Sequence, residues 1–438
     1  MPNDSGLKAE FRAALEAVTP PAPWLAATVK EGLRAKQSKR RSDQVRPELH
    51  IGLNAVAIVL LIAFAVAAFG VFMALHQLAV PARHGAGFVI FPTKMLSPTT
   101  GWALADPSEL WRTSDGGSHW TKATPPSLPD REPDTGSYFL DGTHAWIVET
   151  GGLVSARYVV SFRTDDGGRS WHEGTPITAL RSLSTLYPQV YFVDASRGWL
   201  LLETANTANA WSPTLYRTTD GGLHWDLASN LASTVTEFGC GERMMFSTST
   251  TGWLAFTCEQ RPSLFVTHDG GATWHDQLLP AAPPSVKCQC QFLDPPTFFG
   301  QMSGIIVLSG SPGALFTTSD GGLTWAGRAL PGEIQMEVSF GDASHGWAVA
   351  GSSSELTKNP LSLTEPTLPL PLYQTNDGGA TWAPVPTDLL LQSADGRINQ
   401  FYFVDKNNGF AIRVKSPGAS QFLKTTDGGR RWTVVARL

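Results

Sequence analysis

Seven aspartates of this 438-residue chain occupy the same position in a repeated phrase, Thr-x-Asp-Gly-Gly-x-x-Trp. Carboxylates can act as general acids or bases, and several together can hold a metal ion. Both uses require the carboxylates to converge on one point. The phrase returns about every 50 residues, so each aspartate belongs to a separate structural unit. The pattern therefore predicts no metal site and no cofactor. It gives a structural role to Asp115, Asp166, Asp220, Asp269, Asp320, Asp377 and Asp427.

The two glycines of each phrase predict a tight hairpin turn, because glycine adopts the positive φ angles that such a turn needs. The aspartate before them can accept hydrogen bonds from backbone N–H groups of the same turn and so clamp it. The tryptophan five residues after the aspartate falls on the returning strand. Its large apolar surface can pack there against a neighbouring sheet.

A second phrase precedes each copy and consists of an apolar strand, a short polar turn and Gly-Trp, as in residues 192–199 and 340–347. Two hairpins per repeat give four short strands, which make one propeller blade. Seven repeats predict an all-β fold, a seven-bladed β-propeller of four-stranded blades over residues 88–438. Weaker versions of the phrase end in Trp102, Trp146, Trp253, Ile305 and Phe410.

The Asp-Gly-Gly-x-x-Trp phrase resembles the Asp-box, or BNR repeat, of sialidases, sortilin-type receptors and the photosystem II stability/assembly factor family. The resemblance covers residues 88–438, and the alternation of Gly-Trp strands with Asp-box hairpins looks most like the seven-bladed assembly-factor-like propellers. It implies a role in assembling or stabilising membrane complexes. It implies neither a particular partner nor a photosynthetic role, because propellers host unrelated functions.

In an antiparallel blade the first and third turns share one face, so the Gly-Trp and Asp-box turns gather there and the other connections emerge on the opposite face. Those other connections differ in length, as at residues 203–213 and 350–371. Variable loops on a rigid scaffold often carry recognition. We expect this loop face to bind a partner, with contacts at Trp211, Arg157 and Arg261. For Trp211 the alternative interpretation is that it covers a blade edge.

A glycan-binding or glycan-cleaving propeller is the second hypothesis. A sialidase-like site needs clustered arginines, a tyrosine nucleophile with a glutamate partner, and an acid/base aspartate. The Arg-Ile-Pro phrase of that family is absent from the entry strand at residues 88–94, and we predict that the chain is not an enzyme. The arginines are scattered singly: Arg157, Arg181, Arg197, Arg243 and Arg413. The histidines near the box tryptophans are interpreted as solvated strand neighbours: His119, His172, His224 and His275.

Residues 51–75 contain no charged side chain and are long enough to cross a hydrocarbon core of about 30 Å as a helix. We predict one transmembrane helix over residues 51–77 and a linker over residues 78–87. Lysines and arginines are concentrated before this run, which places the N-terminus in the cytoplasm and the propeller outside the cytoplasmic membrane. A cleaved signal peptide is the competing interpretation, but its charged region would be unusually long and no clear cleavage site follows.

Residues 1–50 form the predicted cytoplasmic juxtamembrane segment, which is partly helical because Leu7, Phe11 and Leu15 recur at helical spacing. It serves either as a tethered arm or as a docking helix for a cytoplasmic partner. A third hypothesis, a transmembrane sensor, uses the loop face as receptor and this segment as output. Nucleic-acid binding is disfavoured, because the basic cluster is short and the formal net charge is -5.

Four cysteines occur, all in the part predicted to lie outside the membrane, where disulfides can form. Cys240 and Cys258 are equidistant from Ser249, which falls in the turn of a predicted hairpin, so we favour a disulfide between them. The alternative pairs Cys258 with Cys288 or Cys290. The function predicted from the whole sequence is a membrane-anchored extracytoplasmic scaffold that binds a protein partner.

Overall fold

The computed structural model describes residues 90–105, 109–126, 131–152, 157–180, 188–207, 210–231, 243–258, 261–281, 292–309, 313–331, 334–350, 368–369, 372–393, 396–415 and 419–437. They belong to one compact unit, Gly85–Leu438. The predicted juxtamembrane segment, membrane helix and linker all lie outside the described residues. Within the described part of the chain, no helix has the length and apolar character needed to cross a membrane.

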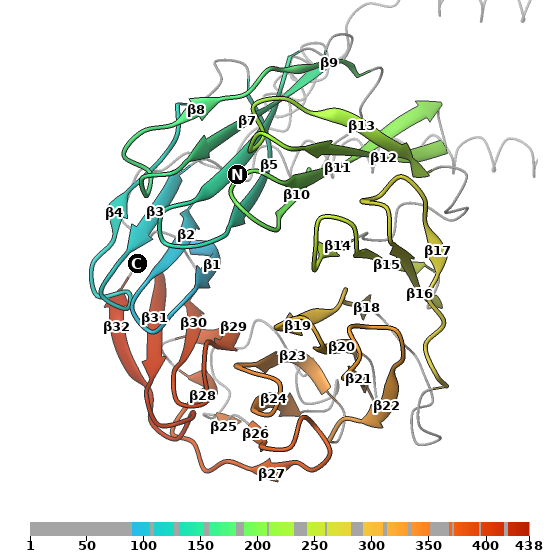
Figure 1. Ribbon diagram of the computed structural model, residues 1–438. Helices are drawn as coiled ribbons and strands as arrows, with labels where there is room; N and C mark the ends of the chain where they lie inside the picture. Colours follow the sequence, from blue (N-terminus) through green and yellow to red (C-terminus); the bar gives the residue numbers. More distant parts are fainter. Residues whose placement is uncertain are drawn as a thin grey trace, which may run out of the picture. The chain divides into compact units, whose positions relative to one another are not determined.

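The described strands form seven antiparallel sheets arranged as the blades of a propeller (Figure 1). Blade one contains β1 (Ile90–Met95), β2 (Gly101–Ala105), β3 (Glu109–Thr113) and β4 (Thr121–Lys122). Blade two contains β5 (Arg131–Phe139), β6 (Ala145–Gly151), β7 (Arg157–Thr164) and β8 (His172–Glu173), with β9 (Ile177–Leu180) paired to β7. Blade three contains β10 (Gln189–Phe192), β11 (Gly198–Thr207), β12 (Ala210–Thr218) and β13 (Asp226–Asn230).

The remaining blades vary this plan. Blade four contains β14 (Arg243–Phe246), β15 (Gly252–Cys258), β16 (Arg261–Thr267) and β17 (His275–Asp276). In blade five, β18 (Phe292–Leu293) and β19 (Thr297–Phe299) both pair with β20 (Ser303–Ser309), followed by β21 (Ala314–Thr318) and β22 (Ala326–Ala329). Blade six contains β23 (Ile334–Phe340), β24 (Gly346–Ala350), β26 (Leu372–Thr375) and β27 (Ala383–Pro384). Blade seven contains β29 (Gly396–Phe403), β30 (Gly409–Lys415), β31 (Ala419–Thr425) and β32 (Thr433–Arg437), extended by β28 (Leu390–Ser393) and β25 (Leu368–Pro369).

The first strand of each blade lies nearest the centre of the ring and the fourth lies at the outside (Figure 1). The second strand is packed between neighbours on both faces, so it carries apolar residues in an unbroken run rather than in alternation. In β6 every residue is buried. The outermost strands are short and exposed, as in β4 and β8. The predicted all-β fold with seven four-stranded blades is confirmed.

Three aromatic rings form the joint between neighbouring blades. At the joint of blades two and three, Trp146 from the Gly-Trp phrase stacks on Phe192 with ring centroids 3.7 Å apart, and the Asp-box residue Trp225 meets Phe192 edge-on at 6.0 Å. The indole Nε1 of Trp146 donates a hydrogen bond of 2.9 Å to the carbonyl of Gly221 in the next blade. The same arrangement joins blades three and four and blades six and seven. The Gly-Trp tryptophans therefore hold adjacent blades together.

The joint of blades four and five departs from this pattern. Trp253 is 1% exposed, and its Nε1 has no hydrogen-bond partner among the described residues. Its ring lies 4.9 Å from Phe298 at a tilt of 34° instead of stacking on it. In blade five, Ile305 replaces the tryptophan altogether. Among the weaker phrases, Trp253 and Ile305 lack the indole hydrogen bond, whereas Trp102 and Trp146 donate one to the next blade.

The ring closes between blades seven and one through side chains. The hydroxyl of Tyr402 accepts a hydrogen bond of 2.9 Å from the backbone N–H of Met95, and Lys424 Nζ donates to the carbonyl of Pro98 at 2.8 Å. The sheet of blade seven is built from strands of the C-terminal region, while β1 pairs with β2. Closure in the described residues therefore rests on contacts between blades rather than on a strand shared by the two ends.

The two faces of the propeller differ in regularity. The prediction of a polar loop at residues 203–213 is wrong. There β11 and β12 continue as a long hairpin, in which Ala205 pairs with Trp211 and Thr207 with Ala210. The corresponding hairpin of blade one ends at Ala105, which pairs with Glu109. The strands of blade three are longer because their backbone pairing continues from Glu203 to Thr207. The polar composition of this segment did not indicate a strand.

Candidate functional site

The Asp-box turns are built around two linked side chains. In blade five, Asp320 Oδ1 accepts the backbone N–H of Thr324 at 2.9 Å, and Asp320 Oδ2 accepts the hydroxyl of Thr324 at 2.6 Å. Thr318 Oγ1 donates to Asp320 Oδ1 at 2.7 Å and accepts the N–H of Gly322 at 3.0 Å. Gly321 and Gly322 have φ angles of 75° and 90°, which only glycine adopts readily. Both carboxylate oxygens of Asp320 therefore accept hydrogen bonds from groups of the same turn.

The same hydrogen bonds recur in every blade, with a change only in the residue four positions after the aspartate. That residue is threonine in blades four, five and six and serine in blade two. His119 and His224 contact Asp115 and Asp220 through Nδ1, and Arg431 contacts Asp427 through Nε. His119 and His224 are largely exposed, and the position four residues after the aspartate also brings each ring into contact with the box carboxylate.

Hydrogen bonding keeps these carboxyl groups ionised. The Thr324 hydroxyl and backbone N–H lower the pKa of Asp320 to about 2, and the backbone N–H and ring of His119 lower the pKa of Asp115 to about 2. In Asp166 the hydroxyl and N–H of Ser170 hold the pKa well below its usual range. A general acid needs a carboxyl that is protonated near the working pH, so these aspartates are poorly suited to proton donation.

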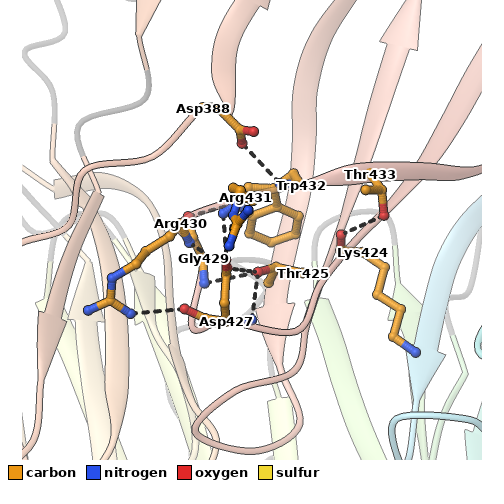
Figure 2. A network of polar contacts seen from close by, with 9 residues as sticks. All are labelled: Asp388, Lys424, Thr425, Asp427, Gly429, Arg430, Arg431, Trp432 and Thr433. Atoms are coloured by element: carbon orange, nitrogen blue, oxygen red, sulfur yellow. Dashed lines mark hydrogen bonds and ion pairs between the residues drawn. The ribbon is translucent and has the colours of Figure 1, made fainter.

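Blade seven shows how the connection from the previous blade is attached to a box (Figure 2). Asp427 Oδ1 accepts the N–H groups of Arg430 and Arg431 at 3.1 and 2.9 Å, and Arg430 Nη1 donates to the carbonyl of Asp427. Asp388, from the segment between β27 and β28, accepts the N–H of Trp432 at 2.9 Å. The polar groups of this turn are therefore engaged inside the blade and with its connecting segment.

A second set of clamps holds the turns that precede Gly-Trp. Asp194 Oδ1 accepts the N–H groups of Ser196 and Arg197 at 2.9 and 2.8 Å. The carbonyl of Ser196 then accepts the N–H of Gly221, so the two turns of one blade are hydrogen-bonded to each other. Equivalent aspartates are Asp141, Asp342 and Asp405, while Ser97 and Thr248 replace them in blades one and four. The turn face is thus a continuous structural layer.

The three predicted contact residues lie at the loop-face ends of the third strands of consecutive blades. Arg157 begins β7, Trp211 is the second residue of β12, and Arg261 begins β16. Arg157 is 9% exposed and its backbone pairs with Leu180, so its side chain is covered. The side chains of Trp211 and Arg261 lie outside what the structure describes. The role of these residues in binding stays a prediction.

The predicted disulfide lies partly outside the described residues, since only the backbone of Cys258 is included. The register of β14 and β15, in which Arg243 pairs with Ala255 and Phe246 with Gly252, is centred on Ser249 as the sequence symmetry requires. The pairing of Cys240 with Cys258 stays a prediction.

The described arginines do not gather at one place. Arg197 pairs with Asp194 in a blade-three turn at 2.6 Å, and Arg243 pairs with Asp294 at the joint of blades four and five. Arg413 donates to Gln421 in blade seven. Arg181 lies outside the described residues. In the part of the chain that the structure covers, no group of three or more His, Cys, Asp or Glu side chains is placed to hold a metal ion.

These turns and joints define a seven-bladed β-propeller, and comparison with known proteins gives a more specific resemblance. The chain is 32% identical over 177 residues to the photosystem II assembly lipoprotein Ycf48 of Synechococcus sp. (strain CC9902). The match includes 39% of this chain and 43% of that protein, so the chain spans less than half the length of the curated relative. The resemblance to the assembly-factor propellers that the repeats predict is confirmed. No protein-family model matches the chain.

Solved structures with a similar fold include YCF48 bound to D1 peptide, with 16% identity, a TM-score of 0.47, and coverage of 80% of this chain and 99% of that chain. YCF48 from Cyanidioschyzon merolae has 16% identity, a TM-score of 0.43, and coverage of 79% and 95%. The GH74 enzyme of Niastella koreensis has 15% identity, a TM-score of 0.34, and coverage of 80% and 56%.

Sequence reasoning missed a cluster on the innermost strands, formed by Lys94, Tyr138 and Tyr191. The three residues occupy the same position in blades one, two and three, each paired across the sheet with the tryptophan of the second strand. Aligning the repeats on that tryptophan would have shown one lysine and two tyrosines in register. Their contacts cross from blade to blade, so no local pattern revealed them.

Proposed function

We propose that this chain is a membrane-anchored, extracytoplasmic propeller that binds a protein partner and assists the assembly or stability of membrane complexes. The observation that supports this proposal most is the 32% identity over 177 residues to a protein named as a photosystem II assembly lipoprotein. The similarity does not identify the partner of this chain. Residues 51–77, as a transmembrane helix with a cytoplasmic N-terminus, would tether the propeller beside such complexes.

Binding is favoured over catalysis by how the turn-face carboxylates are used. In the boxes, Asp269 binds the hydroxyl and N–H of Thr273, and Asp377 binds the same groups of Thr381. Each aspartate belongs to a different blade, so the boxes do not supply the two facing carboxylates of a glycoside hydrolase. A glycan-binding or glycan-cleaving propeller remains the alternative hypothesis, and it needs a carboxylate pair, a tyrosine and clustered arginines at one mouth of the ring.

The loop face is a better candidate than the turn face for the surface that binds the partner. The turn face repeats one hydrogen-bonded pattern seven times, whereas the hairpins of the opposite face differ from blade to blade. The β11–β12 hairpin extends five residues beyond the level at which Leu202 pairs with Thr214, and it carries Trp211. A long two-stranded hairpin on a rigid ring offers both backbone and side-chain groups to a partner. We therefore assign the partner site to the loop face around this hairpin.

The proposal is tested by shortening the hairpin without changing its register. Residues 205–211 are replaced by Asn-Gly, which closes a two-residue turn between Thr204 and Ser212, a pair that already lies in register. Tagged full-length chain is purified from mild-detergent membranes and its partners are quantified by mass spectrometry. We expect a partner that is retained by wild type and lost from the shortened variant. A turn-face variant, Leu323→Ser at a side chain that is 71% exposed, is the control and should keep that partner. Loss from the control alone would overturn the assignment.

A further inference from the structure

The innermost strands of blades one, two and three place three polar side chains in a row at the centre of the ring. Lys94 is the penultimate described residue of β1, Tyr138 of β5 and Tyr191 of β10. Each is the cross-strand partner of the tryptophan of its own blade, as in the pairing of Lys94 with Trp102. The row therefore lies at one level of the ring, where β1, β5 and β10 are neighbours (Figure 1).

The three side chains are in contact across two blade boundaries. Lys94 Nζ lies 5.1 Å from the centroid of the Tyr138 ring, within the range of a cation–π interaction. The rings of Tyr138 and Tyr191 are 4.8 Å apart at an interplanar angle of 51°. Burial raises the pKa of both tyrosines, so both hydroxyls stay neutral and keep a proton that can be donated.

The ammonium of Lys94 has unused hydrogen-bonding capacity. Its one hydrogen bond reaches the carbonyl of Phe139 at 3.5 Å, which is long, and no carboxylate of the described residues pairs with it. Other cations are satisfied: Lys424 reaches the carbonyl of Pro98 at 2.8 Å. Lys94 is exposed to solvent, yet desolvation by the surrounding protein lowers its pKa. Solvent therefore reaches the Lys94 amine even though protein atoms surround much of it.

We propose that the centre of the ring binds a carboxylate group, with the Lys94 ammonium as its charge partner and the Tyr138–Tyr191 hydroxyl pair as the neighbouring hydrogen-bond donor. A single ammonium with hydroxyl donors matches the charge and acceptor geometry of one carboxylate. Arg243, on the inner strand of blade four, is by contrast already paired with Asp294 at 2.5 Å. This site does not depend on the loop-face partner, because its residues lie on the innermost strands.

Carboxylate binding is measured first on the wild-type full-length chain in detergent micelles. Reductive methylation with ¹³C-formaldehyde gives each lysine its own NMR signal, and the Lys94 signal is assigned by its loss in Lys94→Met. Acetate is titrated against acetamide, which has the same shape and no charge. We expect the Lys94 signal to move saturably with acetate and not with acetamide. Equal responses to both, or no response to either, would overturn the proposal.

Variants then test the donors. Tyr138→Phe keeps the ring and removes the hydroxyl, and should weaken acetate binding about threefold, while Lys94→Met should weaken it at least about tenfold. Lys122→Met is the control, because Lys122 pairs with Glu109 on the outermost strand of blade one and should bind acetate as wild type does. If Lys94→Met fails to fold, Lys94→Arg assigns the signal instead, because arginine is not methylated, and the wild-type titration and Tyr138→Phe then test the site. Unchanged binding in Tyr138→Phe would remove the tyrosine pair from the site.

The source of the carboxylate is resolved with two short peptides. One peptide carries only a free C-terminus, and the other is amidated and carries one glutamate. Stronger binding of the first assigns the site to a chain end, and stronger binding of the second assigns it to an acidic side chain. The hairpin-shortened variant should bind either peptide as wild type does, so failure of the loop-face proposal is distinguishable from failure of this one.

Discussion

The turn face of the propeller is uniform from blade to blade, whereas the loop face varies. On the turn face, seven Asp-box turns repeat the same hydrogen bonds, and in blades such as three and four each first glycine is also bonded to the preceding turn, as Gly221 is to Ser196. On the loop face, β11 and β12 run to Thr207 and Ala210 while β2 and β3 stop at Ala105 and Glu109. The repeated hydrogen bonds make the turn face rigid, and the variation between blades is found on the loop face.

The difference is sharpest in how polar groups are used. The turn-face carboxylates have hydrogen-bond partners within their own blades, and the lowered pKa values of Asp115 and Asp320 follow from those bonds. A side chain whose acceptors are occupied has little left for a ligand. Changes to the turn face should therefore alter stability, and changes to the loop face should alter binding.

The largest expected effect comes from filling space at a box glycine. Gly117 has φ 91°, and an added Cβ would lie 2.3 Å from the ring of Phe422 in blade seven. Gly117→Ala should lower the free energy of unfolding by about 3 kcal/mol, from the positive φ and the overpacking together. Gly300→Ala is the matched control, because Gly300 has φ 78° and nothing within 4 Å. It should cost about 1 kcal/mol. Equal losses in urea denaturation would show that blade closure at Phe422 is not tight.

On the loop face, the predicted Cys240–Cys258 bridge would close the first hairpin of blade four. Its removal in Cys258→Ser should lower the free energy of unfolding by about 2 kcal/mol under oxidising conditions. The same variant measured with reductant should match reduced wild type. Peptide mapping without reduction should recover the linked pair, and four free thiols in protein taken from the membrane would refute the bridge.

Two tryptophans test the blade joints. Trp146 and Trp253 are each 1% exposed, but only Trp146 donates its indole N–H to the next blade, at 2.9 Å to Gly221. Both Phe variants lose similar ring volume. Trp146→Phe should therefore be less stable than Trp253→Phe by about 1 kcal/mol, the net value of a hydrogen bond whose acceptor is left buried. If Trp253→Phe proves the more costly, the indole bonds do not hold the blades.

The smallest effect is the pH dependence of a box. The pKa of Asp269 falls to about 2, because the hydroxyl and N–H of Thr273 outweigh the effect of burial. A pKa lowered by folding contributes stability above the unfolded value near 4, and this is lost as pH falls from about 4 to about 2. Asp269→Asn should flatten this acid limb slightly in a stability profile measured by urea denaturation at several pH values. A steeper limb in Asp269→Asn would contradict the assignment.

The sequence predicted the features that repeat. Seven boxes, the four-stranded blades and the common face of the turns followed from local spacing, because glycine and aspartate dictate those turns within eight residues. Contacts across blades were missed, since they depend on which strand positions meet in space: Lys94 beside Tyr138 is one example. The β11–β12 hairpin was predicted as a loop because residues 203–213 are polar, while continued backbone pairing makes them strand. His119 was missed as a box partner because its bond spans a turn.

Photo-crosslinking in intact membranes tests the central claim most directly. Benzoylphenylalanine is placed at Trp211 on the loop face in one variant and at Leu323 on the turn face in another, and crosslinked products are identified by mass spectrometry. The account predicts a discrete protein partner crosslinked from position 211 and none from position 323. A partner crosslinked from position 323 with none from position 211 would contradict it.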